Sequence, residues 1–353
     1  MKLKKVIGAA AAGFCASWAL ISFAAVKKVF SVMFPHWYPH DYCTMMRYKE
    51  LPAPVKRRSL DFFSGENKLK GYVYGEENTK GLIVFSHGIL SWHEDYLSGI
   101  LELVRLGWTV FAYNNTGMAD SEGKDARGLV QGVLDLNAAL DCVNADESLR
   151  KRRKFLLGHS QGGYSVCAVL NMRTDVAGVV SISGFNAPME VTRELGSLEY
   201  GRAFAMFVYP MVKLFYKIRF GRYSDLSAVK GINKSNTPVY IMHGISDTYV
   251  NFYGSALINH KKMIKNPRVK YKELDYESRT GHEDMFISLA AKQYTKTIDE
   301  KVRAAELEYN TDDKYKLPAE VLDGIYSGTD RVKASEVNKE LFSEIDRYFS
   351  RLV

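Results

Sequence analysis

The pentapeptide Gly-His-Ser-Gln-Gly at residues 158–162 constrains the fold more than any other part of the chain. It follows a short apolar run at 155–157 and precedes a stretch, 163–172, that is predicted to be helical. A serine between glycines at a strand-to-helix turn is held at the tip of that turn, because the crowded backbone tolerates almost no side chain beside it. The pattern predicts a strained turn that presents the hydroxyl of Ser160 as a nucleophile. The alternative is a glycine-rich turn that only packs.

A serine hydroxyl is a weak nucleophile and needs a base, together with an acid that orients the base. Asp247 follows an apolar run, 239–242, that is predicted to be a buried strand. His282 follows a second predicted strand, 269–276. Because the loops after parallel strands meet at one edge of the sheet, we expect Ser160, Asp247 and His282 to lie together.

Two other carboxylates are rival acids. Asp225 lies in the segment 185–236, which is described below as the expected cap. Asp275 is predicted to lie inside a strand, where its side chain would point sideways. Asp247 is preferred to both because it follows a strand directly.

The other histidines have less favourable positions for a base. His159 is expected to pack away from the site, and His87 and His243 belong to His-Gly turns in which a structural role is expected. His260 is expected on the surface of a helix at 253–264. Three more have no catalytic context: His36, His40 and His93.

Several separated motifs resemble those of α/β-hydrolases, in the branch that contains monoacylglycerol lipases, lysophospholipases and serine aminopeptidases. Residues 81–88 resemble the third strand and its His-Gly oxyanion turn, and residues 243–250 resemble the loop that carries the acid. Residues 113–121 resemble the loop after the fourth strand, although Asn114 and Ala119 stand where the family usually has Asp and Gly. The resemblance extends from about Ser59 to the C-terminus and includes the Gly281-His282 pair.

The resemblance implies a mostly parallel central sheet with helices on both faces and a helical cap inserted after the sixth strand. In that fold, Ser160 attacks a carbonyl carbon, His282 moves the proton and Asp247 orients His282. The backbone N–H groups of Gln161 and, by matching of positions, Ile89 would hold the oxyanion. No cofactor is implied, and no His/Cys cluster has metal-ligand spacing.

The resemblance also divides the chain. Residues 29–184 and 237–353 are expected to form the two parts of the hydrolase core, and residues 185–236, rich in Phe, Tyr and Met, the cap. An amphipathic stretch at 337–352 fits the closing helix of the family. Residues 283–334 then form a second insertion, for which the sequence suggests no function.

These features predict a serine hydrolase that cleaves a carboxylic ester with an apolar acyl chain. A serine aminopeptidase or amidase on the same fold is the first alternative, and the resemblance does not separate the two. A catalytically silent binding protein of this fold is the alternative from another class. A dehalogenase or epoxide hydrolase is disfavoured, because those enzymes have Asp as the nucleophile.

The N-terminal segment has a different composition. Residues 6–26 contain no charge, and as a helix they would extend about 30 Å, the thickness of a bilayer core. We expect residues 1–28 to be a transmembrane signal-anchor. A signal peptide cleaved near residues 22–24 and a buried helix of the globular domain are the alternatives.

Lysines flank this segment unequally, with three before it and two after it: Lys2, Lys4, Lys5, Lys27 and Lys28. The positive-inside rule then favours a cytoplasmic N-terminus and an extracytoplasmic catalytic domain. Cleavage of the segment would instead give a secreted enzyme.

The net charge of +8 does not indicate a nucleic-acid partner. The basic run at 150–154 precedes the strand of the Ser160 turn, so it is expected at the sheet edge opposite the active site, and no aromatic residues are interleaved with it. The expected partners are therefore a small-molecule or lipid ester and the membrane. The four cysteines do not form a disulfide framework.

Overall fold

The computed structural model describes residues 2–53 and 55–353, and the side chains of residues 2–12, 14 and 15 lie outside this description. Lys2, Lys4 and Lys5, which the charge argument uses, are among those side chains. At the centre is one eight-stranded sheet in the order β1-β2-β4-β3-β5-β6-β7-β8. Its strands are β1 (Arg57–Ser64), β2 (Asn67–Tyr74), β3 (Leu82–Ser86), β4 (Thr109–Tyr113), β5 (Lys154–His159), β6 (Gly178–Ile182), β7 (Val239–Gly244) and β8 (Val269–Leu274).

The sheet is parallel from β4 to β8, and only β1 and β2 pair antiparallel to their neighbours. The predicted mostly parallel sheet is therefore confirmed. The three central strands β3, β5 and β6 are buried along their whole length, as expected for a parallel sheet that is covered on both faces.

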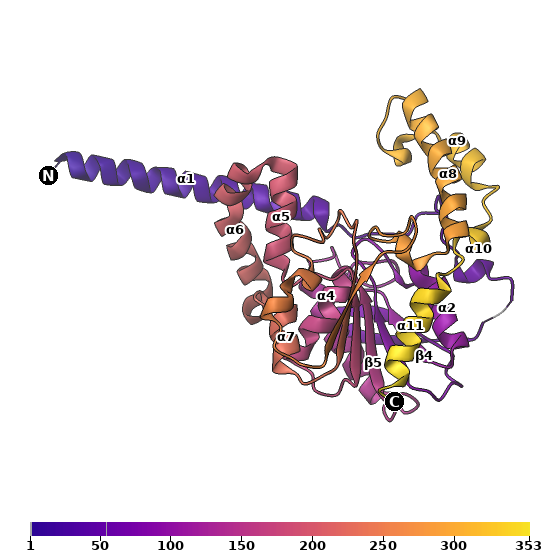
Figure 1. Cartoon of the computed structure of the whole chain (residues 1–353). Coiled ribbons are helices and arrows are strands. Elements are labelled where there is room, and N and C mark those ends of the chain that lie inside the picture. Colours follow the sequence, from indigo (N-terminus) through magenta and orange to yellow (C-terminus); the bar gives the residue numbers. More distant parts are fainter. Residues whose placement is uncertain (1, 54) are drawn as a thin grey trace.

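Helices cover both faces (Figure 1). One face packs against α3 (Gln131–Ala145), α4 (Gln161–Ala168) and α7 (Ala228–Lys234), and the other against α2 (Leu97–Arg105) and α11 (Lys339–Ser350). The closing helix predicted at 337–352 corresponds to α11. Short 3-10 turns complete the core: η1 (Tyr48–Glu50), η2 (His93–Tyr96), η3 (Val169–Asn171), η5 (Leu257–Met263) and η6 (Asp284–Phe286).

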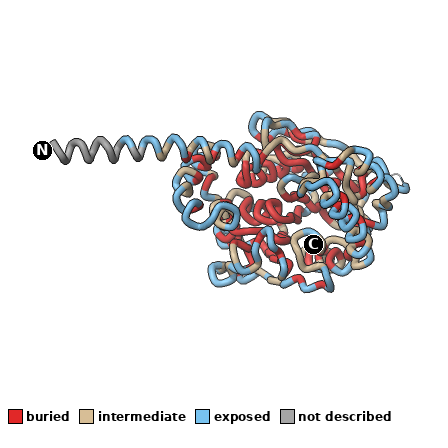
Figure 2. Tube along the Cα trace, turned by 90° about the horizontal axis from the view of Figure 1, so that it is seen from above, coloured by how far each residue is buried: buried red, intermediate tan, exposed pale blue. Residues whose placement is uncertain are grey.

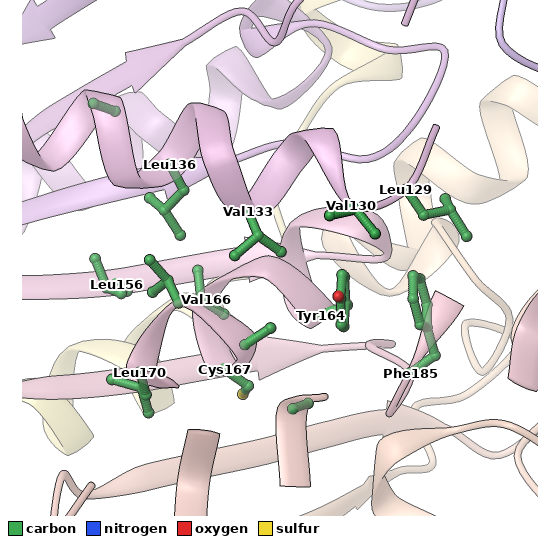
Figure 3. Packing of buried hydrophobic residues seen from close by; sticks show 14 of the residues in the cluster. Leu129, Val130, Val133, Leu136, Leu156, Tyr164, Val166, Cys167, Leu170 and Phe185 are labelled. Atoms are coloured by element: carbon green, nitrogen blue, oxygen red, sulfur yellow. The ribbon is translucent and has the colours of Figure 1, made fainter. Parts of the chain in front are cut away.

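Helices α3 and α4 pack against the sheet through buried apolar side chains (Figure 3). Val133 and Leu136 of α3 face Val166 of α4 across Leu156 of β5, and all four are fully buried. Within α4, Tyr164 stacks on Phe185 with ring centroids 4.7 Å apart. This contact ties α4 to the chain just before the cap.

The cap lies between β6 and β7, as expected. It consists of α5 (Pro188–Tyr200), α6 (Arg202–Phe220) and η4 (Gly221–Tyr223), followed by α7. The insertion after His282 is also helical, with α8 (Leu289–Glu308), η7 (Lys314–Lys316), α9 (Ala319–Tyr326) and α10 (Arg331–Ala334). It has a small apolar cluster of its own, separate from the two clusters on the faces of the sheet.

The N-terminal helix α1 (Lys2–Met33) does not end at the lysine pair that was expected to bound it. It continues through Lys27 and Lys28, and its last turns pack against the cap, where Val26, Phe30 and Phe34 are buried. The earlier part extends away from the body (Figure 1), and the burial colours of Figure 2 show exposed residues along its described part.

Of the described residues, only the window Ala16–Met33 of α1 has the length and apolar composition of a membrane span. Only 17 % of that window is buried in the protein, which disfavours a helix of the globular core. A membrane span and a signal sequence both fit this composition.

A substitution of Phe155 in β5 tests how the sheet packs against the helices that cover it. It is fully buried between Trp108 and Phe349, with ring centroids 5.3 Å and 4.9 Å away. We expect Phe155→Ala to lower the free energy of unfolding by about 3–5 kcal/mol, since it leaves a cavity. Phe63→Ala is the control, because Phe63 is 66 % exposed, and it should change the value by less than about 0.5 kcal/mol. Urea unfolding measures both, and equal effects would contradict this account of the core.

Candidate active site

Ser160 stands at the turn between β5 and α4 in a conformation that non-glycine residues rarely adopt, with φ +56° and ψ −118°. The flanking glycines make this turn possible. A Cβ on Gly158 would collide with the carbonyl of Gly162, and one on Gly162 would collide with the carbonyl oxygen of Ser86. A Cβ on Gly163 would lie 2.7 Å from the carbonyl oxygen of Ile182. The turn is therefore the strained one that the sequence predicts.

Asp247 and His282 lie in the loops after β7 and β8, and these neighbouring strands bring them together. The ring Nδ1–H of His282 donates to Oδ2 of Asp247 at 2.7 Å. The Asp247 side chain is fully buried, and that of His282 is 8 % exposed. The pairing of β7 with β8, with Gly244 opposite Leu274, sets both loops at the same height above the sheet.

The Asp247 carboxylate has further partners. Its Oδ1 accepts backbone N–H groups of Tyr249 at 3.0 Å and Val250 at 2.9 Å. Nε2 of the buried His243 lies 3.1 Å from Oδ2. Burial alone would raise the pKa of Asp247, but the hydrogen bonds from His243 and His282 more than offset it and lower the pKa below its usual range. The carboxylate therefore stays ionised at neutral pH.

Ser160 and His282 come together less directly. Among the described residues, no hydrogen bond joins the Ser160 hydroxyl to the His282 ring. His159, the residue before Ser160, contacts His282 instead, and the centroids of the two imidazole rings lie 4.6 Å apart. Nε2–H of His159 donates to the carbonyl oxygen of His282 at 2.8 Å. Contacts between a serine and its base are often loose in unliganded enzymes and tighten with substrate.

A hydrogen-bond chain through Tyr96 links the three loops of the site. Because a carbonyl only accepts, His159 carries its proton on Nε2, and its Nδ1 accepts from the Tyr96 hydroxyl at 2.7 Å. The Tyr96 oxygen in turn accepts the backbone N–H of Gly88 at 3.3 Å. Burial, with His282 nearby, lowers the pKa of His159 well below its usual value, so this ring remains neutral.

This chain departs from the sequence-based expectation. His159 is buried, but its ring contacts the catalytic edge, whereas it was expected to pack away from the site. Tyr96 was not singled out at all, because it lies in η2, 64 residues from Ser160 in a loop without a motif. Only the three-dimensional arrangement shows its position.

The loop after β3 lies against the Ser160 turn. A Cβ on Gly88 would lie 3.5 Å from Cβ of Ser160, so Ile89 and Gln161 flank the nucleophile. Among the described residues, neither the N–H of Ile89 nor that of Gln161 donates a hydrogen bond to a protein atom. The Gln161 side chain points elsewhere and donates to the carbonyl of Leu129 at 3.2 Å. Within the described part of the chain, both N–H groups therefore lack a protein acceptor, as the expected oxyanion role requires.

The rival acids lie outside this cluster. Asp225 is 59 % exposed on the cap, 3.8 Å from Lys217. Asp275 is exposed just beyond the end of β8 at Leu274, and not inside the strand as expected.

The remaining histidines make structural contacts. Nδ1–H of His87 donates to the carbonyl of Gly88 at 2.6 Å, and its Nε2 accepts the N–H of Asn115 at 3.0 Å. His260 was expected on the surface, but it is partly buried in η5, and its Nε2 lies 3.1 Å from a carboxylate oxygen of Glu190 in the cap. The described residues contain no cluster of His, Cys, Asp and Glu that could hold a metal ion.

In the loop after β4, Asn114 and Ala119 differ from the Asp and Gly that are usual in the family, and the structure shows the surroundings of both. Asn114 accepts the backbone N–H and the Nδ1–H of His93 through one oxygen, at 3.0 Å each, and donates to Asp120 at 2.6 Å. Ala119 has φ +51°, in the region that favours the glycine usual in the family. The amide of Asn114 therefore supplies both the acceptor and the donor that this loop uses.

A cavity of about 250 Å³ lies beside the site. It is lined by Leu90, next to the oxyanion loop, by Tyr96, and by Glu283 and Phe286, which follow His282. Further side chains come from the segment before β1 and from the second insertion, including Arg47 and Tyr315. Ser160 itself does not line this cavity.

Comparison with known proteins agrees with this geometry. Residues 77–219 match a family model described as serine aminopeptidase. The match covers less than half of the chain, and the sheet and helices described above have the α/β-hydrolase fold. The matched range includes Ser160, Gln161 and Ile89 and ends before Asp247 and His282. No curated protein sequence matches the chain.

Among solved structures, an esterase from Pyrococcus furiosus is similar in three crystal forms. In the first form, the TM-score is 0.54 at 19 % identity, over 75 % of this chain and 95 % of the esterase. The second form covers 75 % and 97 % of the two chains at 19 % identity and a TM-score of 0.53. The third covers 76 % and 95 % at 18 % identity and a TM-score of 0.53. At this identity the similarity establishes the fold alone.

Tyr96→Phe tests the hydrogen-bond chain. It leaves Nδ1 of the buried His159 without a partner, which should lower the free energy of unfolding by about 1–3 kcal/mol. Ester turnover should also fall, because His159 contacts both the elbow and the His282 loop. Tyr253→Phe is the matched control, since Tyr253 is 81 % exposed. If both variants behave like the parent protein, the chain does not position the site.

The buried neutral histidines predict how stability depends on pH. Burial lowers the pKa of His87 and of His93 from 6.5 to about 4. Between pH 6.5 and pH 4 the unfolded chain binds more protons than the folded chain. The free energy of unfolding should therefore fall as the pH drops through this range, by up to about 1.4 kcal/mol per pH unit for each histidine. Above pH 6.5 their contribution should be constant. Urea titrations over this range measure the slope, and His93→Gln should reduce it; an unchanged slope would refute the assignment.

Proposed function

We propose that the protein is a serine hydrolase that cleaves carboxylic esters with an apolar acyl group through an acyl-enzyme on Ser160. The observation that carries this proposal is the meeting, at one sheet edge, of a strained serine turn with a buried, ionised Asp247 hydrogen-bonded to His282. The match of residues 77–219 to the serine aminopeptidase family model supports the same chemistry, although similarity of fold does not specify it.

In the proposed mechanism, His282 takes the proton of the Ser160 hydroxyl as that oxygen attacks the carbonyl carbon. Asp247 holds the ring by its Nδ1–H and stabilises the imidazolium that forms. The N–H groups of Gln161 and Ile89 bind the oxyanion, and each such donor stabilises the transition state by roughly 3–4 kcal/mol. His282 then protonates the leaving alcohol, and water cleaves the acyl-enzyme by the same proton path.

An apolar acyl group is favoured by the surroundings of the site. The cavity beside Leu90 is mainly apolar, and the cap carries exposed Phe and Met side chains. We propose that residues 1–28 anchor the enzyme in a membrane, with residues 185–236 as cap and the catalytic domain outside the cytoplasm. An ester in the bilayer would then be close to the site.

An aminopeptidase is the second candidate, and Glu283 is the observation that favours it. This carboxylate follows His282 in the chain and lines the cavity. Among the described residues, no Lys or Arg forms an ion pair with it. A substrate ammonium group would complement such a carboxylate.

Three variants test the proposal. Ser160→Ala should abolish fluorophosphonate labelling and lower turnover by at least about 10³-fold, and Asp247→Asn should lower kcat by about 10⁴-fold. Asp225→Asn is the matched control and should retain parent activity, because Asp225 lies on the exposed cap. Turnover is measured on p-nitrophenyl esters of increasing chain length and on aminoacyl p-nitroanilides.

The outcomes separate the alternatives. Preference for longer esters supports the esterase, whereas preference for the anilides, lost in Glu283→Gln, would favour the aminopeptidase. A folded protein that neither reacts with fluorophosphonate nor turns over any of these substrates would be a silent binding protein.

A further inference from the structure

The helix α1 and the cap helix α6 are joined by aromatic contacts. Trp18 lies 5.7 Å from Phe207 between ring centroids, and Phe23 lies 6.0 Å from Phe215. Phe30 packs on Phe215 at 4.6 Å. Helix α1 therefore touches the cap over more than three helical turns, from Trp18 to Phe30. Its N-terminal part extends away from the body (Figure 1).

The part of α1 before Trp18 is too short to cross a bilayer alone. Residues 6–17 extend about 18 Å as a helix, whereas the hydrocarbon core is about 30 Å thick. The missing length, about 12 Å, is supplied by residues 18–26, which lie on the cap. If α1 spans the membrane, the face of the cap beside these residues must therefore enter the bilayer.

The outer face of α6 has the composition that this position requires. Between Arg202 and Lys213 the helix has no charged residue. Its exposed apolar side chains continue onto the end of α5, and the exposed fractions are 71 % for Leu198, 53 % for Tyr200, 49 % for Phe204, 60 % for Met206, 51 % for Phe207, 44 % for Leu214 and 67 % for Ile218. A contiguous exposed apolar surface of this kind marks an interaction site.

Cations lie within the last part of the apolar surface, where Lys213 and Lys217 alternate with Leu214 and Ile218. Lys213 and Lys217 are exposed on α6, on the part of the helix that follows the apolar stretch, and Lys27 and Lys28 are exposed on α1. These lysines complement anionic headgroups at the boundary of an immersed apolar face. The charged residues at the α5–α6 turn, Glu199 and Arg202, are exposed and flank the face at its other end.

A groove of about 550 Å³ opens between α1, α5 and α6. Its α1 side is formed by Val26, Val29 and Met33, and its cap side includes Leu195 and Val208. Its volume is that of a pocket for a drug-sized ligand. Its walls are mostly apolar, although Thr192, Arg193 and Glu199 also line it. Since α1 itself forms one wall, the groove is continuous with the segment proposed to lie in the bilayer.

We propose that the α5–α6 face lies in the outer hydrocarbon layer beside α1 and that the groove between them holds one acyl chain of a bilayer phospholipid. This inference rests on the membrane anchoring in the proposed function. It does not depend on the chemistry of Ser160. The lipid chain fills a space that the helices leave open and covers apolar side chains that water would otherwise contact.

The test uses the full chain in vesicles of phosphatidylcholine and phosphatidylglycerol, with a trace of phosphatidylcholine that carries a diazirine in its acyl chain. After illumination, mass spectrometry should locate crosslinks on residues 25–34 and 192–218 as well as on the part of α1 before Trp18. Leu307 of α8 and Tyr253 are the internal controls, because both are highly exposed but distant from this face, and they should remain unlabelled.

Gly196→Leu separates the groove from the face. Gly196 lines the groove, and a Cβ there would lie 3.9 Å from Ala205, so the larger side chain fills space without a clash. It should remove the crosslinks on residues 25–34 while those on Phe207 and Ile218, which do not line the groove, persist. Gly324→Leu is the matched control, since a Cβ on this exposed glycine of α9 meets no neighbour, and its crosslinks should equal those of the parent.

Several results would overturn the proposal. Crosslinks confined to α1, or cap crosslinks obtained only when the diazirine is in the headgroup, would place the cap outside the hydrocarbon. Groove crosslinks from a free diazirine fatty acid but not from the phospholipid would assign a different occupant, and crosslinks between two copies of the chain would assign a protein interface. Release of the protein by carbonate would refute the anchor and this inference together. Loss of fluorophosphonate labelling with an intact crosslink pattern would refute only the proposed chemistry.

Discussion

The rest of the site depends on the close approach between the backbone of the Ser160 turn and the end of β3. The turn after β5 passes so near the end of β3 that a single Cβ at Gly162 would collide with the carbonyl of Ser86. This approach requires glycine at the turn, imposes the positive φ of Ser160, and brings the loop after β3 beside the nucleophile. The parallel register of β3 with β5, in which Ser86 is opposite Gly158, maintains it. Strain at Ser160 is thus supported by the most deeply buried strands of the protein.

A second layer of contacts makes three separate loops act as one unit. The hydroxyl of Tyr96 binds both Gly88 and His159, and His159 binds the backbone of His282. These groups are neutral and buried, so their hydrogen bonds are not weakened by salt and are costly to break. The Asp247 carboxylate, with its two backbone donors and two imidazoles, anchors the remaining loop. Displacement of one loop therefore disturbs the others.

The cap connects this site to the N-terminal helix. Tyr164 of α4 stacks on Phe185 at the start of the cap, and the cap helix α6 packs on Phe30 of α1. Helix α4, the cap and α1 therefore contribute to one buried hydrophobic cluster. A bilayer around α1 would fix the orientation of the cap, and through it the face that the active site presents to lipid.

Local sequence patterns predicted several parts of the fold and of the site. Buried apolar runs predicted the strands, glycines around Ser160 predicted the strained turn, and the positions of Asp247 and His282 after strands predicted that they would meet, which their 2.7 Å hydrogen bond bears out. Such patterns could not predict the positions of single residues without a motif, because these positions depend on the tertiary structure. Tyr96 reaches the site because η2 folds over the end of β3, and His159 turns toward His282 because buried partners satisfy both of its ring nitrogens. In the same way, the charges at Lys27 and Lys28 suggested where α1 ends, but helix propensity and packing against Phe215 carry it on to Met33. Local pattern acts over a few residues, whereas these choices depend on partners that the chain brings from far along its length.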